Sequence, residues 1–368
     1  MNSEELQYYL ALQKIKGIGA INAKKLINHL GSAQVVFNVS NTRLSTINGI
    51  GQHIIQQLQN KEILDLAAKE VEKIDQEIIP YSLFTDNSYP QLLKHCIDSP
   101  LVLFSMGNIN IKDQPIISIV GTRSMTAYGR DFIEQFIVDL APYNPIIVSG
   151  FAYGIDIMAH KTAIKHNLQT IAVLGHGLGH IYPKMHKKYM NDIMANGGFI
   201  TEYWYDDEPL RENFLQRNRI IAGLAHATVI VESAAKGGSL VTAEIANSYN
   251  RDVFALPGRV TDTYSAGCNN LIRTNKAQLL NSAKDLVYFL NLDNDKKTEK
   301  PVQPELFIDL NSEEQTIFDQ LKTKGKMTSD ELALATKTPI YKISGILLEL
   351  EIKGVIRPLP GKQFELRI

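Results

Sequence analysis

The chain has 368 residues, of which 44% are hydrophobic and 21% are charged. This composition is typical of a folded globular protein, and the length predicts more than one domain. The 38 Lys and Arg residues and 39 Asp and Glu residues give a net charge of −1, which excludes a protein that is basic throughout. Any anion-binding site must therefore be local.

The first residues, MNSEELQYYLALQKIKGIG, lack the basic start of a signal peptide. No apolar run approaches the roughly 18 residues that span a bilayer. Cys96 and Cys268 lie far apart and have no neighbours at metal-ligand spacing, which argues against both a disulfide framework and a zinc site. We therefore expect a cytoplasmic protein without a membrane contact, a metal or a cofactor.

Residues 1–75 predict a small all-α module, because apolar residues recur at helical spacing. Gly-Ile-Gly interrupts the pattern twice, at 17–19 and 49–51, each time between two helices. This repeat resembles a tandem helix-hairpin-helix or SAM-like module, whose hairpin N–H groups can hold a DNA phosphate. An equally acceptable interpretation is a helical packing module in which the glycines simply permit tight turns.

Residues 76–290 predict an α/β domain, an extended Rossmann-like fold with a mainly parallel sheet. Short apolar runs alternate with helical stretches there, which is typical of βαβ units. The runs are IISIV, PIIVSG, TIAVLG, GFITEYW, TVIVES and DVFALPG. Most of them end in Gly or a small polar residue, so the following loops should gather where open α/β sheets bind ligands.

Residues 291–304, polar and carrying two prolines, predict a linker. Residues 305–368 predict a winged helix, because three helical segments are followed by a β-hairpin pattern. Its presumptive recognition helix carries Glu349 and Glu351 and little Arg, which favours a protein contact or a weak accessory role over duplex binding.

Three glycine-rich loops of the α/β domain are candidates for anion binding. Gly121 and Arg123 follow the first run, the segment from Ser149 through Gly150 to Gly154 follows the second, and Gly237, Gly238 and Ser239 precede a helix. Glycine permits close approach to backbone N–H groups, and arginine adds a charged bidentate donor. A single such loop is unspecific, whereas a row of them at neighbouring strand ends is typical of a polyanion groove.

The segment 213–219 has the densest positive charge. Arg217 and Arg219 stand beside Asn218 and the aromatic Phe214, a combination suited to a sugar-phosphate backbone with stackable bases. The alternative is that the two arginines pair with Glu202 or Glu232 inside the fold.

No enzymatic motif is evident. Residues 175–183 imitate a dinucleotide fingerprint, but Pro183 separates the glycines from the next helix, and no Walker A pattern occurs. Asp156 and His160 share a helix face without a third metal ligand. We expect a binding protein with no catalytic residue; the alternative is a nucleotide-processing enzyme of the phosphoribohydrolase type that uses Glu202 or Glu244.

Seven segments, taken together and in order, resemble the DNA-processing protein A (DprA/Smf) family. They are GTR at 121–123, SGFAYGID at 149–156, IYP at 181–183, RNRIIAGL at 217–224, GGSLVTA at 237–243, ALPG at 255–258 and GCNNLIR at 267–273.

The resemblance implies a homodimer that binds single-stranded DNA, protects incoming DNA in natural transformation and loads the RecA recombinase. By motif position, Arg123, Lys184, Arg217 and Arg219 would contact phosphates, and the loops at 150–154 and 237–239 would offer N–H groups. Three positions depart from the usual family pattern: Tyr153 replaces Arg, Gly237 replaces Ser, and Leu215 replaces Pro. Tyr153 gives up a cation but could stack a base.

Overall fold

The computed structural model describes residues 3–293 and 310–367. These residues form two compact units, which divide between residues 281 and 282. Most of the predicted linker at 291–304, and the first residues of the predicted winged-helix domain, lie outside the described residues. The predicted domain boundaries therefore stay a prediction.

The chain begins with a helical module, as predicted. Its helices are α1 (Ser3–Lys14), α2 (Ala20–Leu30), α3 (Ala33–Asn38), α4 (Asn41–Ser45), α5 (Gln52–Leu58) and α6 (Lys61–Gln76). The two Gly-Ile-Gly segments have nearly the same backbone. Gly17 and Gly49 have φ of 89° and 90°, a conformation that favours glycine, and α2 and α5 begin directly after Gly19 and Gly51.

The two glycine turns of the module pack against each other's helices. A side chain at Gly17 would lie 3.9 Å from Ile54 of α5, and one at Gly49 would lie 3.8 Å from Nζ of Lys25 on α2. The glycine turn of each half of the repeat therefore packs against a helix of the other half.

A nine-stranded sheet forms the centre of the first unit within the described residues, in the order β1-β2-β6-β5-β4-β3-β7-β8-β9. The strands are β1 (Tyr81–Leu83), β2 (Val102–Gly107), β3 (Ile116–Gly121), β4 (Ile146–Ser149), β5 (Thr170–Val173), β6 (Gly197–Thr201), β7 (Ala227–Val231), β8 (Asp252–Ala255) and β9 (Gln278–Leu279). Strands β3 to β9 pair in parallel, whereas β1 and β2 form an antiparallel edge. The mainly parallel α/β fold is confirmed.

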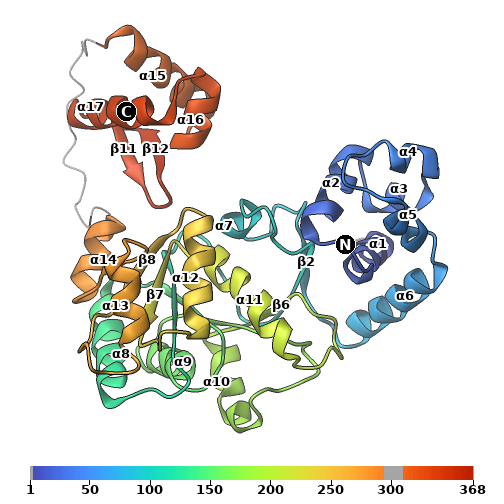
Figure 1. Cartoon of the computed structure of the whole chain (residues 1–368), viewed down its shortest axis with the longest axis horizontal. Helices are drawn as coiled ribbons and strands as arrows, with labels where there is room; N and C mark the ends of the chain where they lie inside the picture. Colours follow the sequence, from blue (N-terminus) through green and yellow to red (C-terminus); the bar gives the residue numbers. More distant parts are fainter. Residues whose placement is uncertain (1–2, 294–309, 368) are drawn as a thin grey trace. The chain divides into compact units, whose positions relative to one another are not determined.

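Helices cover the sheet, as Figure 1 shows. They are α7 (Gln91–Lys94), α8 (Ala127–Leu140), α9 (Ile155–Lys165), α10 (Met190–Ala195), α11 (Arg211–Leu224), α12 (Gly238–Ser248) and α13 (Ala266–Arg273). Helices α9 and α11 both contact β3, β4 and β5, and α11 also packs along α12. The central strands are buried throughout, which explains their nearly continuous apolar sequences.

The second unit contains the winged helix. Its elements are α14 (Ala283–Phe289), α15 (Ser312–Lys324), β10 (Met327–Thr328), α16 (Ser329–Thr336), α17 (Ile340–Ile352), β11 (Ile356–Leu359) and β12 (Gln363–Leu366). Strands β11 and β12 form the predicted hairpin, visible in Figure 1, and β10 pairs with β12. Its small core, which includes Ile317, Leu332 and Leu347, is separate from that of the first unit.

The helical module is joined to the segment between β6 and α11. Lys14 Nζ lies 2.7 Å from Asp207 Oδ1, and the same ammonium lies 4.6 Å from the centre of the Trp204 ring. The backbone N–H of Tyr205 donates to Glu70 Oε1 over 2.6 Å. Among the described residues, no helix is long and apolar enough to cross a membrane.

Candidate nucleic-acid interface

A small pocket of about 50 Å³ lies at the carboxyl ends of the central strands. The loops after β3, β4 and β5 and the first turns of α11 supply its walls. It is lined by Arg123, Gly150, Phe151, Ala152, Tyr153, Tyr182, Pro183 and Phe214. The pocket thus combines an exposed cation, aromatic rings and a glycine-containing loop. Of the three glycine-rich loops singled out in the sequence, those after β3 and β4 line it and the loop at 237–239 does not.

Asp156 holds the loop after β4 in shape. Its Oδ2 accepts hydrogen bonds from the N–H groups of Gly150 (3.1 Å) and Ala152 (3.4 Å). Burial raises the pKa of this carboxyl, and the nearby Arg217 guanidinium acts in the opposite direction. Asp156 therefore has a structural role in this loop. The N–H of Gly150 already donates a hydrogen bond to Asp156.

Arg217 is only 4% exposed and lies against two pocket residues, Gly150 and Phe214. Its Nη1 donates to the carbonyl oxygen of Gly150 over 2.7 Å and to that of Val173. Burial lowers its pKa to about 10, so the guanidinium remains charged at neutral pH. Its Nε has no hydrogen-bond partner among the described residues.

Arg219 is held by a different set of partners. It forms an ion pair with Glu202, and Nη1 donates to the carbonyl oxygen of Asp98 over 2.6 Å. The side chains of the pair are 15% and 13% exposed. The internal pairing with Glu202, which the sequence left as an alternative, is present for Arg219.

Aromatic rings surround the mouth of the pocket. The centres of the Tyr182 and Phe214 rings lie 5.3 Å apart, and those of Tyr153 and His186 lie 5.0 Å apart. Tyr153 and Tyr182 are 40% and 41% exposed, so each offers a free ring surface to a base. The sequence analysis named Tyr153 as a residue that could stack a base but did not name Tyr182, although Tyr182 precedes a proline in the loop after β5, which is a signal that could have found it.

Glu232 ties the loop after β3 to the end of β7. Its carbonyl accepts from the N–H of Thr122 over 2.8 Å, and its carboxylate accepts from the N–H (2.9 Å) and the hydroxyl of Thr126. The sequence offered Glu232 as a second possible partner for the two arginines. Its carboxylate instead binds Thr126 at the start of α8. This fixes the loop that carries Arg123 to the end of β7.

The remaining predicted residues spread around this edge of the sheet. Arg123 and Gly238 are exposed, and Lys184 is an exposed residue at the start of a 3₁₀ helix, Lys184–Tyr189. Ser239 is buried and donates to Ser233 Oγ over 2.9 Å. The fold thus brings Arg123, Gly150 and Phe214 together at the pocket, whereas Arg219, Gly237, Gly238 and Ser239 do not line it.

The residues that suggested catalysis are used within the fold. His160 is fully buried, with Nδ1 2.7 Å from Thr170 Oγ1, and burial lowers its pKa to about 3. Glu244 lies 3.3 Å from Lys276 on the surface. Within residues 3–293 and 310–367, no group of three or more acidic, His or Cys side chains could hold a metal ion.

Residues 81–291 match the family described as DNA recombination-mediator protein A, and residues 300–362 match the DprA winged helix domain. The chain belongs to the DprA/Smf family. It is 31% identical to Protein Smf of Synechocystis over the whole length of both chains.

Two solved DprA structures resemble this fold. The Streptococcus pneumoniae protein has a TM-score of 0.65 at 30% identity, covering 78% of this chain and 98% of its own. The Helicobacter pylori protein, whose structure was described for its single-stranded DNA binding mode, has a TM-score of 0.52 at 31% identity. It covers 58% of this chain and 96% of its own. The family resemblance and the fold class drawn from the sequence are therefore confirmed.

Proposed function

We propose that this chain binds single-stranded DNA, with little sequence preference, at the carboxyl ends of β3, β4 and β5. The observation that carries the proposal is the pocket in which Arg123 stands beside the exposed rings of Tyr153 and Tyr182. A cation for phosphate and free aromatic faces for bases are what sequence-tolerant single-strand binding requires. Membership of a recombination-mediator family, and the single-stranded DNA binding described for the H. pylori relative, support it.

The proposed contacts divide by accessibility. Arg123 and Lys184 are exposed and would meet phosphates directly, and Phe214 with its neighbouring tyrosines would stack bases. Arg217, which is buried, would add positive potential from below the surface. The other proposed site residues lie along the same edge of the sheet: Gly121, Ser149, Gly150, Gly154, Asn218, Arg219, Gly237, Gly238 and Ser239. Of these, Ser149, Arg219 and Ser239 are buried or paired internally and would shape the path of the strand.

The cellular role proposed with this site is that of a binding protein without a catalytic step. It would act as a homodimer in the cytoplasm, protect incoming single strands in natural transformation and load RecA on them. The support is the family membership, together with the internal pairing of Glu202 with Arg219, which occupies one of the two carboxylates an enzyme was expected to use.

Fluorescence anisotropy with a labelled oligo-dT tests the proposal. We expect Arg123→Ala/Lys184→Ala to weaken binding and to reduce the slope of log K against log salt by about 1.4, since each phosphate contact contributes about 0.7 on single strands. The matched control is Lys112→Ala/Lys165→Ala, which removes two exposed cations from the opposite edge of the sheet. Equal binding to duplex DNA, competition by AMP, or an unchanged slope in the first variant would overturn the proposal.

A further inference from the structure

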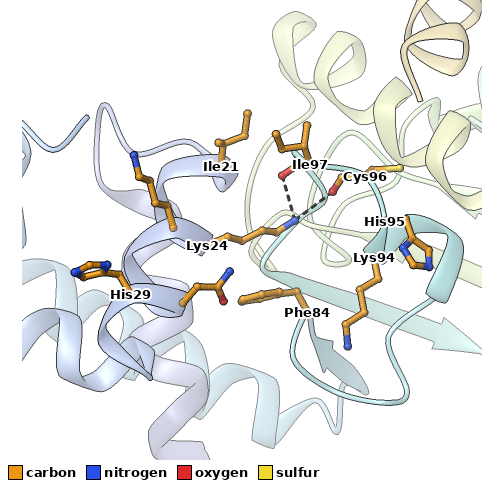
Figure 2. Close-up of a pocket in the computed structure, with 10 residues that line it drawn as sticks. Ile21, Lys24, His29, Phe84, Lys94, His95, Cys96 and Ile97 are labelled. Atoms are coloured by element: carbon orange, nitrogen blue, oxygen red, sulfur yellow. Dashed lines mark hydrogen bonds between the residues drawn. The ribbon is translucent and has the colours of Figure 1, made fainter. Parts of the chain in front are cut away.

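A second, much larger hollow lies between α2 of the helical module and the segment around α7. Its volume is about 690 Å³. Figure 2 shows its lining side chains, which come from both elements: Ile21, Lys24, Lys25, Asn28, His29, Phe84, Lys94, His95, Cys96 and Ile97. We call it the α2 groove. It contains three lysines and two histidines, and none of these ten residues is acidic.

Lys24 fixes the two walls of the α2 groove relative to each other. Figure 2 shows its side chain crossing from α2 to the carbonyl oxygens of Cys96 and Ile97, each 3.4 Å from Nζ. The same ammonium donates to Ser99 Oγ. These bonds hold the two walls in place, so binding would cost little ordering of the chain.

The positive charge of the groove is not neutralised from within. Lys25 donates to the carbonyl oxygen of Asn48, and Lys94 to the carbonyl oxygens of Asp86 (3.2 Å) and Thr85 (3.5 Å). Among residues 3–293 and 310–367, Lys24, Lys25 and Lys94 form no ion pair.

The nearby carboxylates are already engaged by other donors. Asp98 accepts from the Tyr249 hydroxyl, and Asp86 accepts from the N–H of Leu83 over 2.8 Å. Burial, followed by the charge of Arg219, lowers the pKa of Lys24 to about 8, and the Asp98 carboxylate acts in the opposite direction. The groove is thus a site of concentrated positive charge that an anion would stabilise.

We propose that the α2 groove is a second nucleic-acid contact surface, in which Lys25, Lys94 and His95 hold the phosphates of a strand. Exposed Ile21 and Ile97 on its walls, 47% and 69% accessible, give apolar surface to sugars and bases. We call the small pocket at the carboxyl ends of β3, β4 and β5, which includes Arg123, Gly150 and Phe214, the strand-end pocket. The identity of the polyanion rests on the function proposed for that pocket. A strand long enough to reach both surfaces gains additional phosphate contacts, whereas a short one binds only at the strand ends.

The test compares a short oligo-dT of about 6 nucleotides with one of about 30, both fluorescently labelled, on the full chain. The variant is Lys25→Glu/Lys94→Glu, which leaves the Lys24 bridge in place. The matched control is Lys112→Glu/Lys165→Glu, the same charge change at the opposite edge of the sheet. Circular dichroism confirms folding of both. Protection of Lys25 and Lys94 from acylation by the long strand, measured by mass spectrometry on the unmodified chain, provides a readout independent of affinity.

We expect the groove variant to bind the long strand at least about tenfold more weakly, with a salt slope reduced by about 1.4, and to bind the short strand nearly as before. Protection of both lysines in the wild type supports the same conclusion. If both strands bind the wild type but the groove variant behaves like the control, the α2 groove proposal is wrong. If a poly-glutamate peptide protects the lysines and the long strand does not, the groove takes an acidic protein segment instead. If neither strand binds the wild type, it is the proposed function that fails.

Discussion

Arg217 and Arg219 lie two residues apart on α11, yet their guanidinium groups are fixed to different parts of the sheet. Arg217 bonds the carbonyl oxygens at the ends of β4 and β5, beside the strand-end pocket. Arg219 pairs with Glu202 and bonds the carbonyl of Asp98, in the segment that borders the α2 groove. A variant that replaces both arginines would therefore disturb the pocket and the Glu202 ion pair at once. Arg217 and Arg219 need to be replaced in separate variants.

Loss of Arg219 should act mainly on stability. Arg219→Met leaves the buried Glu202 carboxylate without its cation, and we expect the free energy of unfolding to fall by about 3–5 kcal/mol. Glu202→Gln/Arg219→Met should recover more than half of the loss, because the uncompensated charge is gone. Urea unfolding of the two variants and the wild type measures this. Equal destabilisation of the single and double variants would show that the charge of Glu202 is not the cause.

Gly150→Ala should damage the strand-end pocket. A Cβ at this position would lie 2.5 Å from Nη1 of Arg217 and 2.6 Å from Oδ2 of Asp156, so both groups would have to move. We expect a loss of about 1–3 kcal/mol in stability and a weaker affinity for single-stranded DNA. Gly345→Ala in α17 is the control, because its methyl group meets no atom within 4 Å and should stabilise the helix slightly. An unchanged affinity in Gly150→Ala would argue against the pocket as the binding site.

His160 should make the fold sensitive to acid. Burial holds its pKa at about 3 in the folded chain, with smaller contributions from His186 and Arg217, against an ordinary value of 6.5. Between these values only the unfolded chain takes up the proton, so stability is complete above about pH 7 and is lost as the pH falls. From about pH 7.5 to pH 5, this residue should cost about 2 kcal/mol.

His160→Gln isolates that contribution. The variant should lose about 2 kcal/mol less than the wild type over the same pH range, since the other histidines are common to both chains. Urea unfolding at the two pH values gives the comparison. Parallel losses in the two chains would mean that His160 is protonated in the folded state or does not titrate in this range.

Tyr153→Arg should add a phosphate contact. Tyr153 lies in the pocket lining and is 40% exposed, so an arginine at this position would face a strand bound in the pocket. We expect tighter binding of oligo-dT at low salt and a salt slope steeper by about 0.7. Tyr153→Phe, which keeps the ring and removes only the hydroxyl, should bind like the wild type. A slope that does not change in Tyr153→Arg would place the strand away from this loop.

The regular elements could be predicted because their sequences are locally consistent. The apolar runs predicted β3 to β8 close to their observed positions, and the three helical segments predicted for the winged helix are α15, α16 and α17. β1, β2 and β9, by contrast, were not predicted, and β1 and β9 have only three and two residues. Such short strands exist because a neighbouring strand offers an edge to pair with, and a local apolar pattern does not carry that information.

The candidate site was predictable in location but not in its details. Glycines after successive strands pointed to one edge of the sheet, and that edge is where Arg123, Gly150 and Phe214 meet. Which arginine is exposed depends on contacts with residues far away in the sequence: Arg217 with Gly150, and Arg219 with Glu202 and Asp98. The sequence offered Glu202 as one possible partner, but spacing along the chain does not show which arginine pairs with it.

The bonds from Lys14 and Glu70 to residues 205–207 have a mechanical consequence. The segment they hold leads directly into α11, and four residues further along lies Arg211, the first residue of that helix. The helical module is therefore bonded to the segment that leads into α11. A displacement of α1 or α6 would act first on the start of α11, one turn away from Phe214 of the strand-end pocket.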